Sequence, residues 1–214
     1  MGKWVNGKPT FNGDRKRTMT VNSTAIFIRS SWVLANFLGW FAGAVLIILT
    51  SGLFDSIGLE GFQFYLGISM GAGIGYFQWK ILRHHSIGAE WIVSSIVGLG
   101  APFLLVDLMK RYGGLPDNGA WLQVCVSFGG VIVAFWQSRL LQRRGIRSVR
   151  WLFAGWAGWV LAAATVLAMD YTKYLSSNKL VLFFLNLTLI IAGGAALGVV
   201  TAPTMQRLLT GRSA

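Results

Sequence analysis

Three glutamines are the side chains of this sequence best suited to hold a polar ligand. Gln78, Gln137 and Gln206 each stand near the end of a long apolar segment, close to basic residues. A primary amide both donates and accepts hydrogen bonds, so three amides brought together could form a polar gate or a site for a lipid headgroup. The same amides could instead bond only to neighbouring helices, as polar side chains commonly do in membranes. The sequence leaves both interpretations open.

No pattern for acid–base, nucleophilic or metal chemistry accompanies these amides. His84 and His85 are adjacent, and neighbours on a helix point about 100° apart, so they cannot chelate one ion from one helix face. Cys125 is the single cysteine, and Glu90 and Asp107 stand at the ends of an apolar segment rather than in its middle. Ion-coupled transporters usually place an ionisable group inside the membrane. We therefore expect no enzyme activity and no metal site, and the sequence does not specify a cofactor.

The composition indicates which kind of protein positions these residues. Of 214 residues, 54% are hydrophobic and 12% are charged, and the mean hydropathy is +0.58. A soluble domain carries about 25% charged residues. These values exclude a disordered chain and a water-soluble globule, and they indicate an integral membrane protein.

Six apolar segments predict an all-α bundle of six transmembrane helices. Each segment is close to the length of about 20 residues that crosses a bilayer, and a helix is the structure that satisfies its backbone there. The segments are residues 31–53, 62–81, 90–109, 121–141, 151–169 and 180–201. We expect a basic cytoplasmic tail at 1–30, a transmembrane domain at 31–209 and a short cytoplasmic tail at 210–214.

Positive charge is concentrated on one side of this expected bundle. Fifteen of the 19 lysines and arginines fall before residue 31, after residue 206, or in the connections near residues 80–90 and 139–150. By the positive-inside rule, this side is cytoplasmic, so both termini lie inside and the protein belongs in the inner (plasma) membrane. The net charge of +12 then reflects topology rather than nucleic-acid binding. Anionic lipids are the expected partners of one basic cluster, formed by Arg143, Arg144, Arg147 and Arg150.

The chain also repeats itself with a period of about 60 residues. Trp32, Trp91 and Trp151 open the first, third and fifth segments at intervals of 59 and 60 residues, each followed by small residues. This period predicts three helical hairpins, at 31–84, 90–144 and 150–209, around a pseudo-threefold axis. We expect the three tryptophans to anchor the chain at the membrane interface, and the three glutamines to form a ring. Helix packing is expected at Gly39, Gly43, Gly71, Gly75, Gly98, Gly130, Gly158, Gly194 and Gly198.

Part of the repeat resembles an element of a bacterial family of polytopic membrane proteins of cyanobacterial type. The family pattern is Gly-x-x-x-Gly-x-x-Gln-Trp-x-x-Leu-Arg, a basic turn, and then a helix that begins with Trp. Here Gly71, Gly75, Gln78, Trp79, Leu82, Arg83 and Trp91 match it. The second copy departs at Ser138 and Gln142, which replace the Trp and the Arg. The resemblance implies the hairpin fold and implies no particular activity.

Two functions fit these features. The first is a non-enzymatic accessory or scaffold subunit that packs against other integral membrane proteins through small-residue and aromatic faces. The alternative is a carrier or transporter that holds a lipid, a pigment or another small apolar molecule between its hairpins. A bound molecule or a stoichiometric protein partner would discriminate between them.

Overall fold

The computed structural model describes residues 12–58, 61–116, 121–146 and 148–211, and every regular element within them is a helix. The six long helices follow the six expected segments, and a single 3-10 turn, η1 (Arg83–His85), separates two of them. The long helices are α1 (Asn12–Ser56), α2 (Phe64–Leu82), α3 (Glu90–Gly113), α4 (Trp121–Arg143), α5 (Val149–Thr172) and α6 (Lys179–Thr210).

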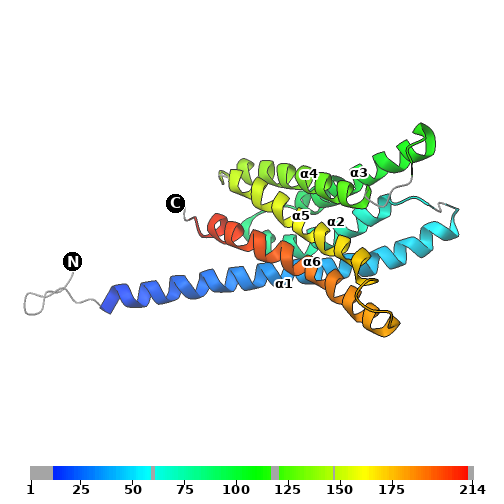
Figure 1. Ribbon diagram of the computed structural model, residues 1–214. Coiled ribbons are helices and arrows are strands. Elements are labelled where there is room, and N and C mark those ends of the chain that lie inside the picture. The colour runs from blue at the N-terminus through cyan, green and yellow to red at the C-terminus, as the bar shows by residue number, and fades with distance from the viewer. Residues whose placement is uncertain (1–11, 59–60, 117–120, 147, 212–214) are drawn as a thin grey trace, which may run out of the picture.

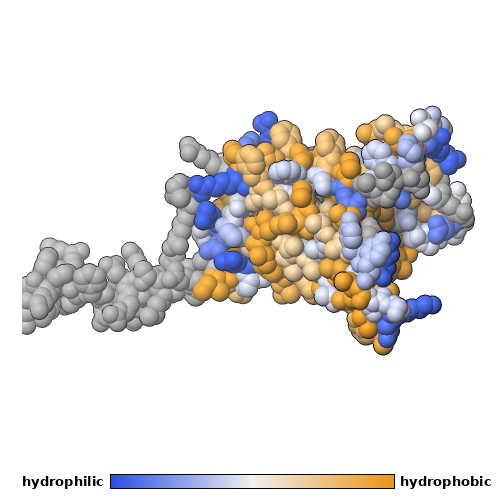
Figure 2. Space-filling model, viewed as in Figure 1, coloured by the Kyte–Doolittle hydropathy of each residue, from blue (hydrophilic) through white to orange (hydrophobic). Residues whose placement is uncertain are grey.

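Five of these helices, α1, α3, α4, α5 and α6, are long and apolar enough to cross a membrane. The exception, α2, has 19 residues and includes Gln78 and Lys80 near its end. Figure 2 shows a broad apolar surface between two more hydrophilic ends. This distribution fits a protein embedded in a bilayer, in which the apolar band would face hydrocarbon and the two ends would face water.

The first helix differs from the expected arrangement of a separate tail and a span that starts at residue 31. α1 runs without interruption over 45 residues, from Asn12 to Ser56, and its first turns extend beyond the bundle (Figure 1). No glycine or proline occurs between residues 14 and 38 to end the helix. Residue 30 is therefore not an element boundary.

The helices form a closed ring. Each helix packs against its neighbours in sequence, and α6 returns to pack against α1. The C-terminal end of α6 lies at the end of the bundle where α1 enters (Figure 1). We call this the basic end, because it carries Lys80, Arg83, Arg139, Arg143, Arg144, Arg150 and Arg207. The connections that follow α1, α3 and α5 lie at the other end, here called the distal end.

The core consists of three layers from the basic end to the distal end. The tryptophan layer contains Trp32, Trp91 and Trp151, and the middle layer contains Trp40 and Trp159; each draws buried residues from all six helices or their adjoining turns. The distal layer is smaller, and its buried residues, Phe103, Val106 and Cys125, pack against side chains of α2, α3 and α4 and of the segments beside them. The bundle is thus fully packed at one end and packed on one side only at the other.

Glycines allow the helices of this ring to approach closely. A Cβ on Gly39 would lie 2.7 Å from the Cα of Ile74 in α2, closer than side chains pack. Each of the nine glycines expected to pack helices faces a neighbouring helix of this chain in this way. Gly67, Gly73, Gly129 and Gly193 approach neighbouring helices similarly.

We predict opposite effects for two Gly→Ala substitutions in α1. Gly39→Ala should lower the free energy of unfolding by about 1–3 kcal/mol, because the new methyl group collides with the α2 backbone. Gly52→Ala should leave stability unchanged or raise it by up to about 1 kcal/mol, since nothing lies within 4 Å and alanine favours the helix. Size-exclusion chromatography of detergent-solubilised protein after heating measures both. Equal midpoints for the two variants would contradict the close approach.

Candidate functional site

Three tryptophans from alternate helices meet at the centre of the basic end. The indoles of Trp32 and Trp91 are 0% exposed and that of Trp151 is 1% exposed. The ring centroid of Trp151 lies 5.8 Å from that of Trp32 and 5.7 Å from that of Trp91. An indole without exposed surface cannot sit at a lipid–water boundary. These tryptophans therefore do not have the place expected for interface anchors; they form a plug inside the ring.

The plug is held by hydrogen bonds from its indole N–H groups to side chains of neighbouring helices. Gln78, which is 3% exposed, accepts a bond from Trp91 Nε1 at 2.8 Å through its Oε1. Its Nε2 donates to Asn36 Oδ1, also at 2.8 Å. Gln78 thus connects α1, α2 and α3 through one amide.

The next helices repeat this geometry. Gln137, which is 2% exposed, accepts a bond from Trp151 Nε1 at 3.2 Å and donates to Ser95 Oγ at 3.1 Å. Asn36 and Ser95 each follow a plug tryptophan by four residues. The corresponding residue in α5 is Gly155, which has no side chain to offer.

The third position of this pattern is occupied by Thr201 and not by Gln206. Trp32 Nε1 donates to Thr201 Oγ1 at 2.9 Å, and this bond joins α1 to α6 and closes the ring. Gln206 lies farther along α6 and is half-buried. The spacing within the helices explains the difference, because Thr201 follows Gly194 by seven residues, just as Gln78 follows Gly71. A search for the polar residue seven positions after the packing glycine, instead of one at a set distance from the tryptophan, would have identified Thr201.

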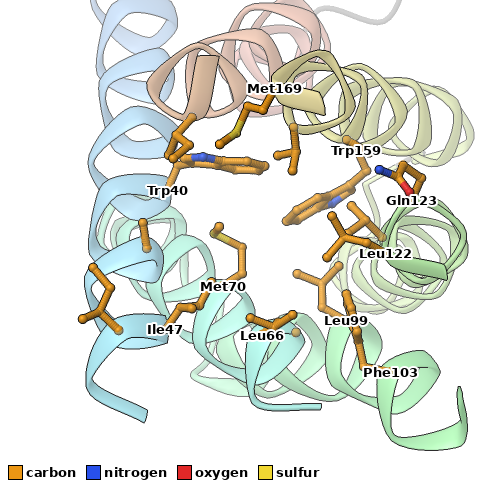
Figure 3. Close-up of a pocket in the computed structure, with 17 residues that line it drawn as sticks. Trp40, Ile47, Leu66, Met70, Leu99, Phe103, Leu122, Gln123, Trp159 and Met169 are labelled. Atoms are coloured by element: carbon orange, nitrogen blue, oxygen red, sulfur yellow. The ribbon is translucent and has the colours of Figure 1, made fainter. Parts of the chain in front are cut away.

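A cavity of about 330 Å³ lies on the distal side of the plug, inside the ring. All six helices contribute to its wall, for example through Trp40, Met70, Leu99, Leu122, Trp159 and Ile190 (Figure 3). The rings of Trp40 and Trp159, with centroids 6.2 Å apart, lie on the side nearest the plug. Gln123 is the one hydrophilic residue among the 17 that line it. The cavity therefore suits an apolar molecule rather than an ion or a polar metabolite.

Nothing in the sequence distinguishes the residues that line this cavity. Ala163 and Met70 have the same type and periodicity as residues packed into a solid core. An empty space inside a bundle depends on how far the helices diverge, which the hydrophobic pattern does not encode. Sequence analysis therefore missed these residues.

A buried carboxylate joins α3 to the start of α2. Asp107 is 4% exposed, and its Oδ2 accepts hydrogen bonds from the backbone N–H groups of Gln63 and Phe64 at 2.8 and 2.7 Å. These groups belong to the first turn of α2, where backbone donors lack helical partners. Asp107 thus caps α2 from a neighbouring helix, a structural role that its position at the end of an apolar segment did not reveal.

The basic cluster expected to bind anionic lipid lies at the surface of the basic end. Arg143, Arg144 and Arg150 are exposed, whereas Arg147 falls outside the described residues. Arg143 and Arg144 border a second, smaller pocket of about 270 Å³ together with Glu90 and Ile87. His84 and His85 are exposed on η1 nearby. Binding of anionic lipid at this cluster stays a prediction.

Comparison with known proteins gives no further assignment. No protein-family model, no curated protein and no solved structure matches the chain. The resemblance carried by Gly71, Gly75 and Gln78 therefore remains a prediction, and function has to be argued from the chemistry of the plug and the cavity.

We predict that the two kinds of glutamine respond differently to replacement by leucine. Gln78→Leu should lower the free energy of unfolding by about 1–3 kcal/mol, because the indole of Trp91 and the amide of Asn36 lose their partner inside a buried site. Gln206→Leu should have little effect. Thermal midpoints in detergent measure both, and Thr201→Val should fall between them. A Gln206→Leu variant as unstable as Gln78→Leu would contradict the place of Thr201 in the ring.

Proposed function

We propose that the chain is a six-span protein of the inner (plasma) membrane, built from three repeated hairpins with both termini in the cytoplasm. α2 completes the count of six, since its 19 residues extend over about 28 Å, close to the hydrocarbon thickness of about 30 Å. Its polar residues are tolerable in a membrane because α1 and α3 flank it and Gln78 is buried. The matching bonds of Gln78 and Gln137 support the repeat.

The distribution of charge supports this orientation. The basic end, which would face the cytoplasm, carries the exposed residues Arg83, Arg143 and Arg144. The distal end carries four basic residues, Lys110, Arg111, Lys173 and Lys179, and most of the acidic ones. Translocation of loops is biased against lysine and arginine, so the distal end would face outward.

Within this bundle, we propose that the protein binds a small apolar molecule in the central cavity. The observation that carries the proposal is the cavity itself, to whose wall all six helices contribute and which is lined almost wholly by apolar side chains. Its volume of about 330 Å³ lies within the usual range for ligand sites, about 300–1,000 Å³. The lining offers no acid, base or nucleophile, so the proposed role is binding or carriage and not catalysis.

The scaffold hypothesis is the second candidate. This hypothesis requires small-residue faces that partner proteins can contact. Gly71, Gly130 and Gly194 already contact helices of this chain and are not free for another protein. What favours a partner is the exposed aromatic surface of the last two helices, which includes Phe153, Trp156, Phe183 and Phe184. Lipid can cover the same surface, so the cavity is the more specific feature.

The proposed topology predicts which cysteine substitutions react on which side. Arg144→Cys should react with a membrane-impermeant maleimide only when the cytoplasmic face is accessible, as in inverted vesicles. Tyr174→Cys, in the exposed connection after α5, should react in intact cells. The native Cys125 is buried and provides the unreactive background. Reaction of Arg144→Cys in intact cells would overturn the orientation.

Filling the cavity should expel its ligand. Ala163 lines the cavity and is buried, whereas its neighbour Ala164 is exposed on the outer face of α5. We expect wild-type protein, purified gently from native membranes, to carry an apolar molecule detectable by native mass spectrometry. Ala163→Phe should lose that molecule, and the matched control Ala164→Phe should retain it.

Two outcomes would count against apolar binding. A wild-type protein that emerges empty would remove the main support for the cavity as a site. A stoichiometric integral membrane protein that copurifies equally with Ala163→Phe and with Ala164→Phe would instead favour the scaffold function.

A further inference from the structure

We infer that the cavity is reached from the side, through a gap between α1 and α6, by a hydrocarbon chain of a membrane lipid whose headgroup stays outside the ring. This inference rests on the proposed function and adds the class of ligand and the route by which it arrives. The argument depends on where α1 and α6 touch, where they separate, and what closes the other sides.

α1 and α6 cross tightly in the half of the bundle nearer the basic end. A Cβ on Gly194 would lie 2.5 Å from Trp40 Cβ, and one on Gly198 would lie 2.9 Å from Val33 Cα. Beyond this crossing the two helices diverge toward the distal end (Figure 1). The ring is therefore sealed at Trp40 and opens past it.

Past the crossing, each helix is bound to its other neighbour. Thr50 of α1 lies in hydrogen-bond contact with Ser69 of α2, with their oxygens 3.0 Å apart. On the other side, Thr172 of α5 donates to Asn186 Oδ1 of α6 at 2.8 Å. The first and the last hairpins are thus each held together while the space between them widens.

The cavity extends into this gap. Ile48 of α1 lines the cavity although the residue is 73% exposed, so the lining is continuous with the outer surface at this residue. Ile190 lines the cavity from α6. The gap has apolar edges at a depth where a bilayer would present acyl chains, and an apolar chain can pass it without losing hydrogen bonds.

Two other directions are closed by packed side chains. Toward the basic end stand the middle layer and the tryptophan plug. Opposite the gap, Phe103, Val106 and Cys125 fill the space among α2, α3 and α4. With the basic end and the α2–α4 side closed, the lateral gap between α1 and α6 is the route that we infer for a molecule already dissolved in the membrane.

The volume of the cavity limits its occupant to a single hydrocarbon chain. The cavity, about 330 Å³, is roughly twice the size of an engineered cavity of about 150 Å³ that holds benzene. It accommodates one extended chain and not a diacyl lipid with its headgroup. A polar headgroup would also find one hydrophilic residue in the wall, Gln123, so its transfer inside would be unfavourable.

Photolabelling tests this inference in full-length protein reconstituted into phospholipid vesicles. One probe is a phosphatidylcholine with a diazirine at the end of one acyl chain, and the other is a free alkyl diazirine of similar chain length. On irradiation each loses N₂ and inserts into nearby bonds. We expect both probes to label Met70 and Leu99, which line the cavity, as read by peptide mass spectrometry.

A bulky residue at the gap should block entry of the diazirine-bearing acyl chain of the phospholipid probe. Ile48→Trp should reduce labelling of Met70 and Leu99 by the phospholipid probe severalfold, whereas Leu49→Trp should not, because Leu49 is exposed but does not line the cavity. Ile190→Trp provides a second block from the α6 side. Labelling of lipid-facing residues should be the same in all variants, which shows that each is folded in the vesicle.

The outcomes separate the two proposals. If the free probe labels the cavity and the phospholipid probe does not, apolar binding stands and access by a lipid chain is wrong. If Ile48→Trp and Leu49→Trp label alike, the gap is not the route. If neither probe reaches Met70 or Leu99, the proposed binding function falls together with this inference.

Discussion

The organisation of this bundle depends on three buried indole N–H groups, each of which requires a hydrogen-bond acceptor. Trp32, Trp91 and Trp151 lie against one another away from water, where an unpaired N–H costs about 1–3 kcal/mol. Each finds its acceptor on a neighbouring helix, at Thr201, Gln78 and Gln137. Because each bond crosses from one helix to another, satisfying all three fixes the order and the registry of the ring.

The glycines make this arrangement possible at short range. Contact across Gly39, Gly71 and Gly194 brings helix backbones so close that polar groups on adjacent helices fall within hydrogen-bond distance. In a bilayer, where lipid is as apolar as leucine, such close packing and such bonds replace the hydrophobic effect as the source of association. The tight end of the bundle follows from both together.

The same geometry generates the cavity. Helices that cross tightly at one end diverge at the other, and the distal layer fills the resulting space only among α2, α3 and α4. The remaining volume is apolar because its wall belongs to segments selected for the hydrocarbon core. The result is an apolar pocket that is closed toward the basic end by the plug and reaches the outer surface at Ile48, a form compatible with the proposed binding of a membrane-dissolved molecule.

Hydrophobic run length and small-residue spacing are local properties, so the sequence alone predicted the long apolar helices, five of them able to cross a membrane, and the glycines at which they pack. It also identified Gln78 and Gln137 as members of one polar set. The tertiary structure decided the rest. It replaced Gln206 by Thr201, since the partner of Trp32 depends on which residue α6 presents after it crosses α1. It moved the three tryptophans from the expected interface to the axis, and it created a cavity, because both depend on the angles at which helices cross and not on the residues of any one helix.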